Sequence, residues 1–230
     1  MSGPWIKHTI QITSHVSDLT AVFRKLELKM FRTRSKHESG LLELPAELRA
    51  TIFEYALTSD KPVVAFLLDA YQRESYQEAT QPFLTRISRQ VRHESLPLFY
   101  GCNEIVLHTE ERRAQEALRW LEHIQVHLAK LQRISFWLRY ATLTNERSSA
   151  VGALSVSLEH SVRDGAWHVD KEWKWITVVR KPASVRGDGE FLVKTLRSLI
   201  GGRSRDTMGA RDYFEVMTDI RMLYVKDKMM

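Results

Sequence analysis

The stretch LLELPAELRATIFEYAL, from Leu41 to Leu57, follows a polar segment and predicts an amphipathic helix. Pro45 suits the first helical position, because the N–H that proline lacks would have no partner there. Glu47 lies in the first turn, where a carboxylate complements the helix dipole. The run from Thr58 to Pro62 ends the helix, since the residue before a proline resists helical geometry. The apolar side chains form one stripe with Tyr55 on its flank: Leu48, Ile52, Phe53 and Ala56.

A second stretch, FLTRISRQVRHESLPLFYGCN from Phe83 to Asn103, predicts another helical region. Pro97 predicts a kink in it, and Gly101 predicts its end. Between the two stretches we expect a strand from Val63 to Leu68 and a polar loop from Tyr71 to Gln81. The apolar face of the second helical region is formed by Leu84, Ile87 and Val91.

The following residues predict a β-α-β unit. A short apolar run indicates a strand from Glu104 to His108, and a long amphipathic helix is expected from Glu111 to Lys130. A strand from Leu131 to Tyr140 follows directly. The apolar positions of the helix are Ala114, Ala117, Leu118, Leu121, Ile124 and Leu128.

Beyond residue 150 the apolar residues alternate with polar ones, which is typical of strands. Leu154, Val156 and Leu158 are separated by serines, and the residues from Trp173 to Arg180 alternate again. Asp164-Gly165 is a strong signal for a tight turn, so this part predicts a β-hairpin. Two further helices are expected, one from Gly189 to Ile200 and one in the tail after Asp206.

Together these elements predict an α+β fold, in which a helical segment leads into a small mixed β-sheet with flanking helices. We expect three parts along the chain. Residues 1–40 hold a short amphipathic helix, between about Leu19 and Met30, and a basic linker. Residues 41–140 hold the two quoted stretches and the β-α-β unit. Residues 141–230 hold the hairpin and the last helices, packed on the same core.

Composition limits the classes of function. The chain of 230 residues has 34 Lys+Arg and 28 Asp+Glu, a net charge of +6 that permits weak attraction to nucleic acid or acidic protein surfaces. The densest basic cluster, from Lys29 to Lys36, is interpreted as a solvated linker. No apolar run approaches the roughly 20 residues that span a bilayer. A single cysteine and no glycosylation acceptor fit the cytosol or nucleus.

No catalytic motif is present, so we expect neither an enzyme nor a bound cofactor or metal. His123 and His127 have zinc-helix spacing, but Ile124 stands where a metalloprotease has its glutamate, and no third ligand lies nearby. We therefore interpret both as surface or partly buried histidines. Cys102 is expected to be a buried, inert thiol. The Arg-Gly-Asp tripeptide ending at Asp188 is interpreted as accidental.

The tryptophans of the predicted hairpin allow two interpretations. Trp167, Trp173 and Trp175 could stack nucleobases, with phosphates contacted by Lys171, Lys174 and Arg180. One face of the sheet must be covered, however, and large aromatic side chains do this well. Core packing is the favoured interpretation, and contact with a target protein is the second.

The two quoted stretches together resemble the fungal F-box-like proteins, including the group named for two Glu-x-Arg motifs. Leu44-Pro45-Ala46-Glu47-Leu48-Arg49 matches the first motif of that family. The segment from Ser88 to Tyr100 matches the family's Cys-Arg-Gln-x-Arg-x-Glu-x-Leu-Pro-Leu-Phe-Tyr segment, with Ser88 in place of the cysteine. Gln90-Val91-Arg92 replaces the second Glu-x-Arg. The resemblance covers about residues 41 to 140.

The resemblance implies a non-enzymatic protein-interaction adaptor, in its most specific form a substrate receptor of a cullin–RING ubiquitin ligase. Such an F-box-like segment docks on a Skp-type adaptor protein, and the downstream sequence holds a target protein of unknown identity. Carried over by position, the partner-binding residues are Leu44, Pro45, Leu48, Ile52 and Phe53.

Two alternatives stay open. Residues 58 to 82 intervene before the second helical region, so the apolar stripe could instead pack against the chain's own core. The second alternative is a nucleic-acid-associated protein that uses the basic linker and the Trp-rich hairpin. No membrane partner is expected.

Overall fold

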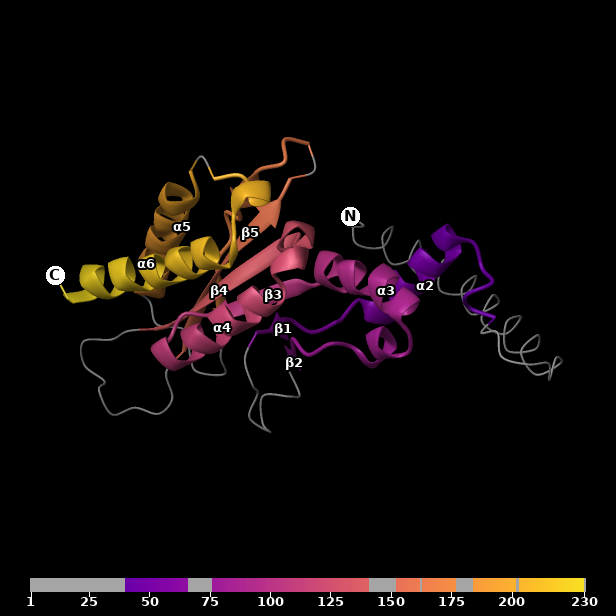
Figure 1. Cartoon of the computed structure of the whole chain (residues 1–230). Coiled ribbons are helices and arrows are strands. Elements are labelled where there is room, and N and C mark those ends of the chain that lie inside the picture. The colour runs from indigo at the N-terminus through magenta and orange to yellow at the C-terminus, as the bar shows by residue number, and fades with distance from the viewer. Residues whose placement is uncertain are drawn as a thin grey trace, which may run out of the picture. The chain divides into compact units, whose positions relative to one another are not determined.

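A computed structural model describes residues 40–65, 76–140, 152–161, 163–176, 184–201 and 203–229 (Figure 1). The chain divides into two compact units, Met1–Ile52 and Phe53–Met230. Helix α2 (Ala46–Leu57) is continuous through that boundary. The helix expected between Leu19 and Met30 and most of the basic linker lie outside the described residues. The predicted boundaries after residues 40 and 140 stay predictions.

In the first unit, a turn ties down the start of α2. The carbonyl of Pro45 accepts the first helical hydrogen bond, from the amide of Arg49 at 3.1 Å, so Pro45 precedes the helix by one position instead of opening it. The guanidinium of Arg49 donates to the carbonyl of Leu42 at 3.3 Å and also to that of Leu44. The arginine of the Leu-Pro-Ala-Glu-Leu-Arg motif thus holds the preceding turn against the helix.

In its described residues, the second unit is built on one mixed sheet. The strand order is β2-β1-β3-β4-β5-β6, and β7 also pairs with β5. The strands from β1 to β4 pair in parallel, whereas β5 is antiparallel to β4, β6 and β7. The strands are β1 (Val63–Val64), β2 (Gln77–Glu78), β3 (Glu104–His108), β4 (Arg133–Arg139), β5 (Ala153–His160), β6 (Trp167–Val169) and β7 (Lys174–Ile176).

Four α-helices and three 3-10 helices accompany the sheet in the described residues. The α-helices after α2 are α3 (Arg89–Cys102), α4 (Glu111–His123), α5 (Val185–Ile200) and α6 (Ala210–Met229). The 3-10 helices are η2 (Phe83–Arg86), η3 (Gln125–Lys130) and η4 (Arg205–Thr207). The predicted α+β class is therefore confirmed.

Several predicted elements are confirmed with shifted ends. The β-α-β unit exists as β3, α4 and β4, but the helix predicted to reach Lys130 changes to 3-10 geometry after Ile124. Helix α5 begins at Val185, four residues earlier than predicted. Asp164-Gly165 does form the turn between β5 and β6, and Gly165 has a φ of 69°, which glycine adopts at little cost.

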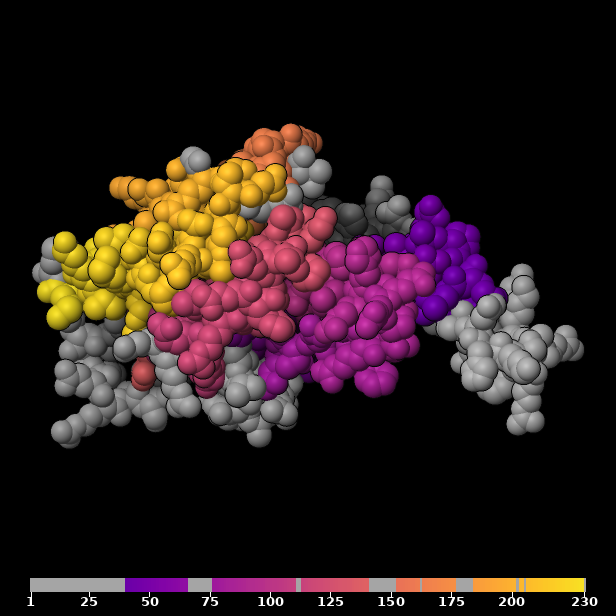
Figure 2. Space-filling model, viewed as in Figure 1, coloured from indigo at the N-terminus to yellow at the C-terminus, as the bar shows by residue number. Residues whose placement is uncertain are grey.

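One face of the sheet carries the main core. Alternation along the strands places Ile105, Ile134 and Leu158 on the same side, and each is fully buried. Helices α4, α5 and α6 cover this side, with α6 packed against both α4 and α5. In Figure 2, α4 and α6 cover the sheet on the side facing the viewer. The apolar stripes of these helices thus supply the second layer of the core.

The opposite face of the sheet is polar at its centre. Ser135 and Ser157 lie opposite each other on β4 and β5, and their hydroxyls share a hydrogen bond of 2.7 Å. Beside them, Arg133 reaches three carboxylates on neighbouring strands and loops: Glu104 at 3.8 Å, Glu159 at 3.2 Å and Asp170 at 3.3 Å. This network connects β3, β4, β5 and the end of β6 across the sheet.

Two glycines make room for tryptophan rings. A Cβ on Gly189 in α5 would overlap the indole of Trp173, and a Cβ on Gly152 would overlap that of Trp175. Gly187, two residues earlier on α5, has open space where its Cβ would be. Gly189 is therefore required by close packing, and Gly187 is not.

We predict opposite effects of alanine at these two positions of α5. Gly189→Ala should lower the free energy of unfolding by about 1–3 kcal/mol, because the new methyl group displaces the Trp173 ring. Gly187→Ala should leave it unchanged or raise it by up to about 1 kcal/mol, since alanine favours the helix. Urea unfolding followed by circular dichroism measures both. Equal effects of the two substitutions would contradict the packing of Trp173 on Gly189.

His108, at the end of β3, is held in its neutral form. Its Nδ1 accepts the backbone N–H of Glu110 at 3.3 Å. The pKa of His108 falls to about 4, mainly because the ring is buried; Arg113, Arg139 and Arg221 contribute to the fall, while Glu110 opposes it. The folded chain therefore resists protonation of this ring through the range in which an unfolded histidine becomes charged.

Because the unfolded state takes up this proton first, stability is lost as the pH falls from about 6.5 toward 4. His108→Gln should remove about 2 kcal/mol of the difference in unfolding free energy between about pH 7 and about pH 5. Urea unfolding at both pH values gives the measurement. The exposed His123→Gln is the matched control and should keep the wild-type pH dependence. An unchanged pH dependence in His108→Gln would refute a buried neutral imidazole.

Candidate interaction sites

The first candidate site is the start of α2, in the first unit. Leu48 is 53% exposed, although it belongs to the apolar stripe of the helix. Pro45 is also exposed, and Leu44 and Ile52 are half-buried. An exposed leucine alone is common on protein surfaces. Here it lies within the motif that carries the family resemblance, next to a turn that Arg49 holds in place.

Phe53 does not belong to this exposed surface. Its side chain is fully buried in the second unit, and that of Leu57, one helical turn later, is also buried. Ala56, which the predicted stripe included, is exposed instead. The prediction that Phe53 binds a partner is therefore wrong, because the ring is enclosed in the chain's own core. The spacing of apolar residues predicts an apolar stripe, but it does not show which residues of the stripe are buried.

Asn103 fixes the end of α2 to the second unit. Its side-chain amide donates to the carbonyl of Leu57 at 2.9 Å and to that of Phe99 at 2.7 Å. Its side-chain oxygen accepts the backbone N–H of Ser59 at 2.7 Å. Asn103 is itself buried, so it serves groups at the ends of both α2 and α3. No role for this residue is predicted from the sequence; the available signal is a polar residue two positions after Gly101, which lies in the last turn of α3.

The second motif of the resemblance forms η2 and α3. Ser88 caps α3, because its hydroxyl accepts the backbone N–H of Val91 at 3.1 Å. A serine in place of the family's cysteine thus has a local structural role. The arginines of this stretch are exposed, and two of them donate to Gln81. Arg86 donates to the backbone carbonyl of Gln81 at 3.2 Å, and Arg92 donates to the side-chain oxygen of Gln81.

The residues considered as metal ligands or nucleophiles make contacts that are common in folded proteins. The ring of His127 stacks on Tyr100, with a centroid distance of 5.3 Å, while His123 is exposed. Cys102 is only half-buried, but burial still raises the pKa of its thiol, which favours the protonated form. Asp188 of the Arg-Gly-Asp tripeptide is buried in α5 and pairs with Lys228 of α6. Its carboxylate therefore forms an ion pair between two helices of the fold.

The three hairpin tryptophans do not form one exposed aromatic surface. Trp167 is 5% exposed and packs edge-on against Tyr213, so this ring packs in the core, as the favoured interpretation expects, and its side chain is not available to a target or nucleic acid. It is buried because β6 turns this side chain toward the helices. Trp173 and Trp175 are half-buried, with their rings against Gly189 and Gly152. Contact of these two with a partner stays a prediction.

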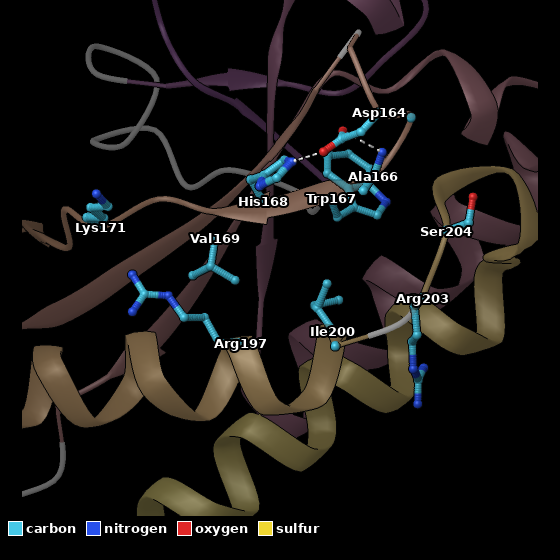
Figure 3. Close-up of a pocket in the computed structure, with 12 residues that line it drawn as sticks. Asp164, Ala166, Trp167, His168, Val169, Lys171, Arg197, Ile200, Arg203 and Ser204 are labelled. Carbon is cyan, nitrogen blue, oxygen red and sulfur yellow. Dashed lines mark hydrogen bonds and ion pairs between the residues drawn. The ribbon is translucent and has the colours of Figure 1, made fainter.

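The second candidate site is a groove between β6 and α5. A pocket of about 540 Å³ lies between β6 and the last turns of α5 (Figure 3). Val169 and Ile200 project into it from the two sides, and Arg197 lies beside Val169. A second hollow of about 700 Å³ shares Lys171 and Arg197 and continues along α5. We call the two together the β6–α5 groove: Trp167, Val169, Lys171, Lys194, Arg197 and Ile200.

A turn next to the groove is fixed by Asp164. Its carboxylate accepts the backbone N–H of Ala166 at 3.1 Å and lies 2.8 Å from Nε2 of His168 (Figure 3). The hydrogen bond from Ala166 is the largest reason that the pKa of Asp164 falls to about 2. The carboxylate is thus ionised at neutral pH and accepts a hydrogen bond within the turn.

Similarity to known proteins adds no family or fold assignment. No protein-family model matches the chain, and neither the curated proteins nor the solved structures give a significant match. Among the helices of the described residues, none is both long and apolar enough to cross a membrane.

Proposed function

We propose that the protein is a non-enzymatic protein-interaction adaptor, in its most specific form a substrate receptor of a cullin–RING ubiquitin ligase. The start of α2 would dock on a Skp-type adaptor protein, and the mixed-sheet unit would hold a target. The observation that carries the proposal is the exposure of Leu48 within the Leu-Pro-Ala-Glu-Leu-Arg motif. When a partner covers a half-exposed apolar side chain, the burial lowers the free energy of the complex.

Two further observations support this function. Arg49 holds the turn before α2, so the segment around Leu48 has a defined shape before any partner arrives. A preformed surface loses less conformational entropy on binding than a flexible one. In the second unit, Phe53 is enclosed and Asn103 binds the carbonyl of Leu57, which fixes the other end of the same helix.

The test is recovery of a Skp-type adaptor protein by the tagged full chain in a pull-down. Wild type should recover it, and Leu48→Asp should reduce recovery about tenfold or more, because a charge replaces the apolar contact. Adding Ile52→Asp should abolish it. Thr51→Asp introduces the same charge at an exposed polar position of α2 and is the matched control, expected to behave like wild type. Failure of the wild type to recover the adaptor would refute the ligase role.

A further inference from the structure

The 3-10 helix η2 presents apolar side chains to water. Phe83 is 81% exposed, and Ile87, which directly follows η2, is 58% exposed. Thr85 faces inward instead: it is buried, and its hydroxyl donates to the carbonyl of Pro82 at 2.7 Å. Residues three apart share an edge of a 3-10 helix, so Phe83 and Ile87 both lie on other edges than Thr85. A single exposed apolar residue is common, but neighbouring ones mark an interaction surface.

Three exposed arginines lie beside this apolar surface. Arg86 shares the edge of Phe83 in η2, and Arg89 and Arg92 lie one turn apart at the start of α3. Helix η2 packs against α3 (Figure 1), and Gln81 accepts hydrogen bonds from both Arg86 and Arg92. The two guanidinium groups therefore lie near the same residue. We call the following five residues the η2–α3 patch: Phe83, Arg86, Ile87, Arg89 and Arg92.

The described residues do not neutralise the charge of the patch. Within those ranges, no ion pair joins a carboxylate to any of its arginines. Glu94, the acidic residue of α3, accepts a hydrogen bond from Gln90 at 3.0 Å and lies about 140° around the helix from Arg89. Glu104, which follows α3, pairs with Arg133 at 3.8 Å. The arginines of the patch therefore favour a partner surface that is acidic.

The spacing of the arginines fits a helical partner. Arg89 and Arg92 are separated by about 4.5 Å along the axis of α3, since each residue of an α-helix rises about 1.5 Å. Carboxylates on one face of a partner helix lie three or four residues apart, which is also about 4.5–6 Å. On one face of an extended strand, neighbouring side chains are about 6.4–6.8 Å apart. A helix lying along α3 can thus place a carboxylate at each of these arginines.

We infer that the η2–α3 patch binds an acidic amphipathic helix of a partner protein. Apolar side chains of that helix pack around the ring of Phe83 and against Ile87, and its glutamate or aspartate side chains meet the arginines. Phenylalanine and arginine are both enriched in protein interfaces, so their combination on one exposed surface suits this role. The inference goes beyond the proposed function, because the whole patch lies in the second unit and includes none of the residues at the start of α2.

The probe is a fluorescein-labelled peptide of leucine, glutamate and alanine. Its leucines recur at i, i+3, i+4 and i+7 with glutamates beside them, so that it forms an acidic amphipathic helix. Anisotropy measures its binding to the full chain. Wild type should bind the peptide, and Phe83→Ala and Arg89→Glu should each weaken binding about tenfold, because the first removes the apolar contact and the second replaces an attraction by a repulsion.

Each of these substitutions has a matched control elsewhere in the second unit. Val126→Ala shortens another apolar side chain, which lies in η3 and is 84% exposed. Arg119→Glu reverses the charge of another exposed arginine, on α4. Both controls should bind the peptide within about twofold of wild type, since neither residue belongs to the patch.

Two altered peptides separate the parts of the inference. The same peptide with a proline at its centre should bind about tenfold more weakly, because proline breaks the helix. The peptide with lysines in place of its glutamates should not bind measurably, since the arginines of the patch repel it.

Four results would overturn the inference. The first is no binding of the acidic peptide by wild type. The second is unchanged binding by Phe83→Ala or Arg89→Glu. The third is equal binding of the proline or lysine peptide. The fourth is tighter binding of single-stranded DNA with the same dependence on Phe83 and Arg89, which would assign the patch to nucleic acid. Leu48→Asp should leave peptide binding intact, and Arg89→Glu should leave recovery of the Skp-type adaptor intact, so the two proposals fail separately.

Discussion

The hydrogen bonds of the Asn103 side chain are the interaction on which the second unit depends where α2 ends. It is a buried amide with hydrogen bonds to Leu57, Phe99 and Ser59. Two of these groups are carbonyls near helix ends, where the helix itself supplies few donors. A buried group left without a hydrogen bond costs about 1–3 kcal/mol, so replacing Asn103 would leave several such costs at once. Phe53 and Leu57 are buried in the core that this amide completes.

The interaction surfaces arise where the layers of the fold are incomplete. Three helices cover one face of the sheet, but β6 is short and lies at an edge in the described residues. The groove lies between β6 and the last turns of α5, next to the bridge between Ala166 and Ser204. The start of α2 differs, because there an apolar residue, Leu48, remains exposed on a helix whose preceding turn is fixed by Arg49. At both surfaces, exposed side chains therefore lie on or beside secondary structure that the fold holds in place.

Sequence periodicity predicted the fold class and most elements, because the signal is local. The alternation around Val156 identified β5, and Asp164-Gly165 identified its turn. Contacts between distant residues were not predictable in the same way. Asn103 and Leu57 are 46 positions apart, so nothing in either local pattern indicated their hydrogen bond. The error at Phe53 has a related cause: spacing shows that a helix has an apolar stripe, but the partner that covers each part of it is set by the rest of the fold.

Asn103 anchors the end of α2, whereas folding does not require Leu48. Urea unfolding of Asn103→Ala and Leu48→Asp compares the two contributions to stability. Asn103→Ala should lower the free energy of unfolding by about 2–3 kcal/mol, because buried groups lose their partners. Leu48→Asp should lower it by less than about 1 kcal/mol, as expected for an exposed helical position. A loss at Leu48 equal to or greater than that at Asn103 would show that Asn103 is not the anchor of α2.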